Sequence, residues 1–158
     1  MPPRTSLSGR IANFGARRVP GVANWFSRRQ ADQFERSGGT KGAQLRGKPI
    51  FRLTVVGRKS GEPRSLMLML VRRGDDLLVC GSQAGTPDAP NWWKNLVAAG
   101  HATAQVGDDT YDVDAREITE PAEREEAWAL LTAAYPDFAS YQALTDRRLP
   151  VAVLTRRA

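Results

Sequence analysis

The sequence predicts an α+β fold in which helices flank a small antiparallel barrel. The turn sequences "RGDD" and "GDD" each lie between two strand-like runs, so each predicts a β-hairpin. Hairpins dominate the chain, and helical stretches are inserted between them. With 158 residues, of which 41% are hydrophobic, the chain has the size of one domain with a substantial core.

The first strands are expected after residue 48, where β-branched and apolar residues become frequent. Residues 49–57 form one such run, and residues 65–72 and 77–82 flank the "RGDD" turn. A helix should follow before residue 100. Asp88 is its expected N-cap, Pro90 suits its first turn and Gly100 ends it.

The second half repeats the pattern of hairpin and helix. Residues 101–118 alternate around the "GDD" turn and predict a second hairpin. Residues 119–136 predict a helix with Thr119 as N-cap and glutamates at the positive end of its dipole. A short helix in 137–146 and a last strand in 149–157 complete the order helix, β, ββ, α, ββ, αα, β.

The N-terminal region, residues 1–47, differs in amino-acid composition from residues 48–158, which form the predicted barrel domain. It is basic and ends in a glycine-rich loop, with helices expected at 8–14 and 22–34. Its aromatic stripe either packs on the domain or lies on an anionic membrane surface. Localisation is therefore predicted as cytoplasmic, with a peripheral position on the inner face of the cell membrane left open.

Charge and composition restrict the function classes. The net charge of +6 favours an anionic partner, although a merely solvated basic surface is the plain alternative. The single cysteine, Cys80, excludes an internal disulfide and lies in an apolar run, which indicates a core residue. The single histidine, His101, cannot build a zinc site, so no metal is expected. No run of about 20 apolar residues is present to span a bilayer.

The turn "GRKSGEPR", residues 57–64, carries the clearest chemical signal. Its glycines permit unusual backbone conformations, and its N–H groups, cations and serine hydroxyl suit a phosphate or carboxylate. It lacks the spacing of a P-loop, and no helix follows it as a dinucleotide fold requires. A charged hairpin turn without a ligand is the alternative.

Two further clusters strengthen the prediction of a ligand. In "GSQAGTPDAPNWWKNL" a polar loop precedes a helix whose Trp92 and Trp93 point to different faces, so one can pack in the core and one can line a cleft. In "YPDFASYQ" the residues Tyr135, Phe138 and Tyr141 recur every three positions and predict an aromatic wall. Core packing explains many such stripes as well.

Together the three clusters resemble the deazaflavin-dependent nitroreductase family. The segments "TVVGRKSGEPRSLMLMLV", "VCGSQAGTPDAPNWWKNL" and "AYPDFASYQALTDRRLPVAVL" are similar to that family's motifs in order and spacing, from about Phe51 to Leu154. The resemblance implies a split β-barrel of the FMN-binding type that binds coenzyme F420, an 8-hydroxy-5-deazaflavin with a phosphodiester and a glutamate tail. It also implies an F420H2-dependent reductase that passes a hydride to a quinone, enone or nitro acceptor.

The resemblance also assigns roles to residues of this chain. The turn would hold the phosphate, the next strand and the loop before the tryptophans would meet the ring, and two tyrosines would line the substrate side as candidate catalytic residues. The cofactor set is Gly57, Arg58, Lys59, Ser60, Gly61, Arg64, Leu66, Met67, Leu68, Ser82, Gln83, Ala84, Asn91, Trp92 and Asn95, and the substrate-side pair is Tyr135 and Tyr141.

Two positions depart from the nitroreducing members of that family. Phe138 stands where they have a third tyrosine, and Gln83 stands where they tend to have a lysine. The loss of a hydroxyl and a cation near the substrate favours a quinone or enone over a nitroimidazole.

The sequence leaves alternatives open for the cofactor and for turnover. The same barrel can use FMN, and a coenzyme F420 carrier without turnover would show the same motifs. A homodimer is a further expectation. Nucleic-acid binding is not expected, because no recognised module for it is visible.

Overall fold

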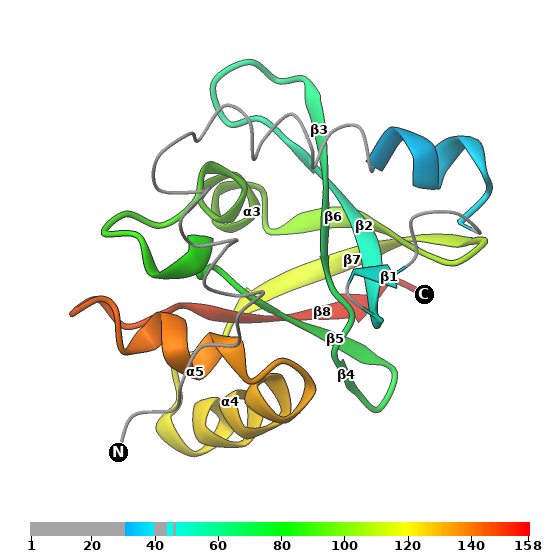
Figure 1. Ribbon diagram of the computed structural model, residues 1–158. Helices are drawn as coiled ribbons and strands as arrows, with labels where there is room; N and C mark the ends of the chain where they lie inside the picture. The colour runs from blue at the N-terminus through cyan, green and yellow to red at the C-terminus, as the bar shows by residue number, and fades with distance from the viewer. Residues whose placement is uncertain (1–30, 40–43, 46) are drawn as a thin grey trace.

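The computed structural model describes residues 31–39, 44–45 and 47–158, and it gives an antiparallel sheet that curls into a barrel with helices on its outside (Figure 1). The strands are β1 (Gln44–Leu45), β2 (Lys48–Val56), β3 (Pro63–Met69), β4 (Arg72–Arg73), β5 (Asp76–Cys80), β6 (His101–Val106), β7 (Asp109–Glu117) and β8 (Val151–Arg156). The helices are the 3₁₀ turn η1 (Gln83–Gly85), α3 (Asn91–Ala99), α4 (Pro121–Ala134) and α5 (Asp137–Gln142), preceded by a helical segment at 31–36.

Strand pairing explains how the sheet closes. The neighbours run β1, β2, β6, β7, β8, β5, β4, and β3 pairs with β2. Only Leu70 and Val71 separate β3 from β4, and Leu78 N–H donates to the Val71 carbonyl at 2.8 Å. One continuous stretch of chain therefore pairs with β2 at one end and with β5 at the other, which closes the barrel as predicted.

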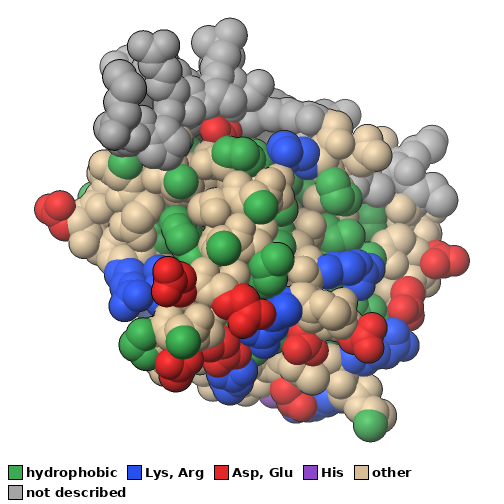
Figure 2. All heavy atoms as spheres, turned by 90° about the horizontal axis from the view of Figure 1, so that it is seen from below, with side chains coloured by type: hydrophobic (Ala, Val, Ile, Leu, Met, Phe, Trp, Pro, Cys, Tyr) green, Lys and Arg blue, Asp and Glu red, His purple; other side chains and the backbone are tan. Residues whose placement is uncertain are grey.

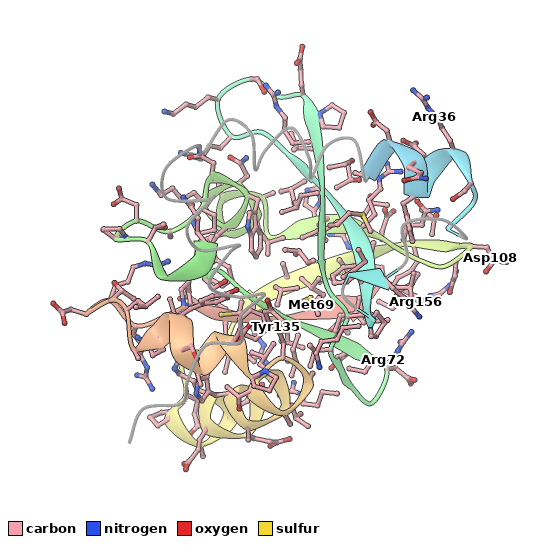
Figure 3. The ribbon with its side chains drawn as sticks, viewed as in Figure 1. Arg36, Met69, Arg72, Asp108, Tyr135 and Arg156 are labelled. Atoms are coloured by element: carbon pink, nitrogen blue, oxygen red, sulfur yellow. The ribbon has the colours of Figure 1, made fainter. Side chains whose placement is uncertain are left out.

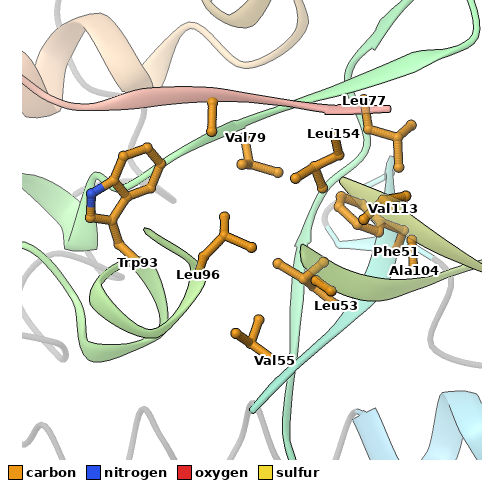
Figure 4. Close-up of a cluster of buried hydrophobic side chains, with 12 residues drawn as sticks. Phe51, Leu53, Val55, Leu77, Val79, Trp93, Leu96, Ala104, Val113 and Leu154 are labelled. Carbon is orange, nitrogen blue, oxygen red and sulfur yellow. The ribbon is translucent and has the colours of Figure 1, made fainter. Parts of the chain in front are cut away.

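Two hydrophobic clusters lie on either side of the sheet. The first fills the barrel interior with residues such as Phe51, Leu53 and Val113, and Trp93 and Leu96 of α3 close one end of it (Figure 4). The second lies between β5, β8 and the helices α4 and α5, around Leu78 and Leu131. Burying this much apolar surface is the main force that stabilises the fold.

Most predicted elements are confirmed, but the first hairpin and two helix caps are wrong. The "RGDD" turn joins only the short β4 to β5, whereas the residues of β3 that were predicted to pair across it pair with β2. Helix α3 begins at Asn91 with Pro90 in the cap position, and Asp88 stays outside it. Helix α4 has Glu120 as its cap, because that carboxylate accepts hydrogen bonds from Ala122 N and Glu123 N. Thr119 was expected there because hydroxyls are common caps, but a carboxylate one residue later satisfies two N–H groups at once.

The predictions for the N-terminal region fall mostly outside the described residues. Residues 1–30, with the helix expected at 8–14 and most of the one at 22–34, are among those not described. Within the described part, Phe34 is fully buried and Glu35 pairs with Arg52 of β2 at 3.1 Å, so residues 31–36 pack on the barrel. The division of the chain at residue 47 stays a prediction.

Candidate functional site

The turn between β2 and β3 keeps its cations exposed and its backbone fixed. Gly57 N–H donates to the Glu62 carbonyl at 2.8 Å, and Gly61 N–H donates to the Gly57 carbonyl at 2.8 Å. Gly61 has a φ of +71°, which side chains other than glycine rarely adopt. Lys59 and Ser60 are exposed at the tip of this turn.

Helix α3 anchors the turn through one buried amide. The side-chain oxygen Oδ1 of Asn95 accepts from Arg58 N at 3.1 Å and from Arg58 Nη1 at 2.7 Å, and Asn95 is 8% exposed. An amide holds a guanidinium in place without neutralising it. In the described part of the chain, Arg58, Lys59 and Arg64 form no ion pair, so the turn presents a positive charge that only the neighbouring Glu62 offsets.

Strand β3 offers an apolar edge next to that turn. Every residue from Ser65 to Leu70 is only partly buried. Among the described strands β3 pairs with β2 alone, so its second edge, the open edge, has no partner strand among the described residues. Leu66 and Leu68 pack against the first core cluster together with Trp92. Met67 points to the opposite face, because side chains alternate along a strand. A flat ligand therefore cannot contact all three side chains from one side.

The loop after β5 brings the second predicted cluster beside the third. Ser82 is nearly buried, whereas Gln83 is exposed and has a φ of +40°, which is uncommon for a residue with a side chain. The φ of Gly85 is +75°, and a Cβ added there would lie 2.4 Å from the Tyr141 carbonyl oxygen. Only glycine allows this loop to approach α5 so closely.

The predicted aromatic wall is present in the structure and is largely buried. The hydroxyls of Tyr135 and Tyr141 are 3.2 Å apart, and the Phe138 ring meets the Tyr135 ring edge-on at 5.1 Å. Tyr141 and Phe138 are 5% and 6% exposed, while Tyr135 is more open. Tyr135 packs against the same core cluster as Met69 at the end of β3, and both lie toward the middle of the molecule in Figure 3.

The tryptophan pair divides as expected. Trp93 is 5% exposed and lies in the barrel core, whereas Trp92 is half-buried and meets it edge-on at 5.9 Å. Asn91 is exposed at the start of α3. The contacts of Asn95 within the described residues hold the turn, and its place at the ring stays a prediction.

One residue of this region was missed at the sequence level. Arg147, in the "TDR" part of the third motif, donates hydrogen bonds to three carbonyls of the loop at Gly81, Ser82 and Thr86. The motif contains it, but no local pattern says that its side chain reaches a segment more than 60 positions earlier.

Cys80 is a buried free thiol. Burial raises the pKa of its thiol to about 12, although nearby Arg124 and Arg147 act in the opposite direction. The thiol therefore stays protonated at neutral pH and serves as a core residue, as predicted. His101 is exposed at the start of β6.

Comparison with known proteins identifies the family. A family model described as F420H(2)-dependent quinone reductase matches residues 25–156. This chain belongs to that family. An F420H(2)-dependent quinone reductase of Mycobacterium tuberculosis is 33% identical over 112 residues, which are 69% of this chain and 74% of that protein. The predicted F420H2-dependent reductase, with coenzyme F420 as its cofactor, is thereby confirmed, and the FMN alternative is not needed.

Solved structures give the same result for the fold. An F420H2-dependent reductase is 38% identical with a TM-score of 0.63, covering 67% of this chain and 93% of its own. A structure described as a domain-swapped dimer is 35% identical with a TM-score of 0.66, covering 85% of this chain and 99% of its own. Among the described residues, no helix is both long and apolar enough to cross a membrane.

Proposed function

We propose that this protein reduces a quinone with reduced coenzyme F420 in a site bounded by the 57–62 turn, the open edge of β3, the 81–86 loop and the Tyr135–Tyr141 pair. The observation that carries this proposal is the turn itself. The turn and the first residues of β3 carry three cations, Arg58, Lys59 and Arg64, without an ion-pair partner in the described chain. Asn95 fixes the turn beside a half-exposed apolar strand. The predicted cofactor residues, Asn95 included, keep their proposed roles.

The residues present fit the chemistry of the cofactor. A phosphodiester and a glutamate tail are anionic, and Arg58, Lys59 and Arg64 are the groups that bind such anions. The ring is flat and largely apolar, and the partly buried Leu66 and Leu68 with Trp92 form a surface of that kind. Backbone groups on the edge of β3 that pairs with no described strand can hydrogen-bond the polar rim of a ring.

The protein binds, orients and excludes water, while the bound coenzyme supplies the hydride. Holding donor and acceptor in contact removes much of the entropic barrier to transfer. Reduction of a quinone to a quinol also needs protons. The Tyr135 and Tyr141 hydroxyls, 3.2 Å apart, form a hydrogen-bonded pair that can hold a proton near the acceptor oxygen.

A quinone is preferred over a nitro compound as the acceptor. Phe138 is buried against both tyrosines, so the wall offers two hydroxyls and not three. Gln83 is exposed and uncharged, so no cation stands at that position to stabilise a nitro group. We expect Phe138→Tyr to raise turnover with nitroaromatics, and an unchanged or lower turnover would mean that the hydroxyl is not limiting.

Assembly and membrane contact are further parts of the proposal. The neighbour described as a domain-swapped dimer supports a homodimer, which light scattering of the purified protein would test. The basic character of residues 1–47 supports peripheral binding to an anionic membrane from the cytoplasm. Sedimentation with anionic vesicles, compared between the full chain and a chain lacking those residues, would test it.

Two measurements test the proposed activity. Fluorescence titration of coenzyme F420 with the purified protein should show saturable binding. Oxidation of the reduced coenzyme in the presence of menadione should then proceed with many turnovers per protein. Binding without turnover for any quinone would favour a carrier, and no binding would reject the proposal.

A further inference from the structure

Arg147 holds the loop between β5 and α3 by its backbone. Its Nε donates to the Thr86 carbonyl at 2.8 Å and its Nη2 donates to the Ser82 carbonyl at 2.8 Å. Both Nη1 and Nη2 reach the Gly81 carbonyl at 3.2 Å. One guanidinium thus ties the start of the loop to its end.

The backbone around Arg147 is held in turn by the Gln142 side chain. The Gln142 side chain donates from Nε2 to the Arg147 carbonyl at 2.8 Å and accepts from Leu149 N at 2.9 Å. In the described part of the chain, no carboxylate forms an ion pair with Arg147. Its hydrogen-bonding capacity is therefore used on the loop, and a planar fork suits several fixed carbonyls better than an ammonium does.

This contact decides which way the loop peptides face. A trans peptide is planar and its C=O and N–H groups point in opposite directions. Because the Gly81 and Ser82 carbonyls face Arg147, the N–H groups of Ser82 and Gln83 face the other side. Neither N–H donates to an acceptor within the described residues. The contact also supports Gln83 at its φ of +40°, a conformation that surrounding contacts must maintain.

The same loop touches the tyrosine wall. Gly85 lies directly against the Tyr141 carbonyl, and α5 leads into the segment that carries Arg147. Displacing the loop would therefore alter both the surface proposed to meet the coenzyme ring and its spacing from Tyr141.

We propose that Arg147 is a positioning residue, which keeps the 81–86 loop in the shape that receives the coenzyme and places it against the tyrosine wall. This inference rests on the proposed function. Arg147 acts through the loop backbone and is not expected to touch the reacting atoms.

The test compares Arg147→Ala and Arg147→Lys with Arg148→Ala, which removes the same side chain from the next, exposed position. The Gly85 and Thr86 N–H groups donate within the loop, to Ser82 and Gln83 carbonyls, so their hydrogen exchange reports its shape without any ligand. We expect Arg147→Ala to speed this exchange and to raise the Kd for coenzyme F420 at least about tenfold, because several charge-assisted bonds are lost.

Rescue by added guanidinium distinguishes a positioning role of Arg147 from a general contribution to stability. Millimolar guanidinium should lower the Kd of Arg147→Ala toward the original value, whereas sodium chloride at the same concentration should not. Arg147→Lys should recover only part of the binding, and Arg148→Ala should behave like the unaltered protein. A folded Arg147→Ala protein with unchanged loop exchange and unchanged Kd would overturn the inference. If the unaltered protein binds no coenzyme, the proposed function fails, and the exchange experiment still decides whether Arg147 positions the loop.

Discussion

Two segments proposed to meet the coenzyme, the 57–62 turn and the 81–86 loop, are built in opposite ways. The turn closes by its own hydrogen bonds, and its cations and glycines are adjacent in sequence. The loop depends on Arg147 and on the close approach of Tyr141, both about 60 positions away. The comparison teaches that a charged anion site can be local, whereas a surface shaped for a flat ring needs support from elsewhere in the fold.

The largest expected effect comes from breaking the close approach at the loop. Gly85→Ala puts a Cβ 2.4 Å from the Tyr141 carbonyl and strains a φ of +75°, so it should cost at least about 3 kcal/mol of unfolding free energy. Chemical denaturation measures this. Gly74→Ala in the β4–β5 hairpin is the matched control, because its φ is +61° but its Cβ meets nothing within 4 Å. We expect it to cost only about 1–2 kcal/mol, and equal costs would contradict the contact.

The next effect concerns the charge of the turn. Arg58→Ala combined with Lys59→Ala should weaken coenzyme F420 binding by about 2–3 kcal/mol, because charge-assisted bonds to the anionic part are lost. Fluorescence titration gives the Kd. Arg36→Ala combined with Arg72→Ala removes the same charge from exposed positions on other elements, at the periphery in Figure 3. If the two double variants bind equally, the turn does not hold the anion.

A smaller effect is expected where the turn does depend on tertiary structure. Asn95→Ala removes the buried acceptor of Arg58 N and Arg58 Nη1, and it should cost about 1–2 kcal/mol of stability. It should raise the Kd for the coenzyme less than loss of the cations does, because the charges remain. Asn91→Ala, an exposed position one turn earlier on α3, should leave the unfolding free energy unchanged. Equal effects would show that Asn95 does not anchor the turn.

The smallest expected effect comes from an ion-pair cluster on α4. It tests whether coenzyme binding by the 57–62 turn and the 81–86 loop is independent of surface charge outside them. Acidic and basic side chains are intermixed on the face seen in Figure 2. Glu123 of α4 pairs with Arg116 and Arg73 at 2.7 and 3.2 Å. The hydrogen bond from Arg116, with that from Arg73, lowers the pKa of Glu123 from 4.5 to about 2. Its stabilising contribution is full above pH 4.5 and is lost as the pH falls through 2.

Glu123→Gln should therefore flatten the loss of unfolding free energy between pH 4.5 and 2. At pH 7 it should leave the Kd for coenzyme F420 unaltered. A changed Kd would connect this ion-pair cluster to the site and weaken the contrast between local and supported segments. Glu125→Gln, an exposed glutamate of the same helix, serves as the control.

The sequence alone determined the antiparallel barrel, the second hairpin, the family and the cationic turn. Each follows from a local pattern, since alternation fixes strands and adjacent cations and glycines fix an anion-binding turn. Only the tertiary structure decided that Asn95 holds the turn and that Arg147 hydrogen-bonds the 81–86 loop. Both outcomes depend on which atoms the folded chain brings within hydrogen-bonding distance of each other. The spacing of residues along the sequence does not specify those distances.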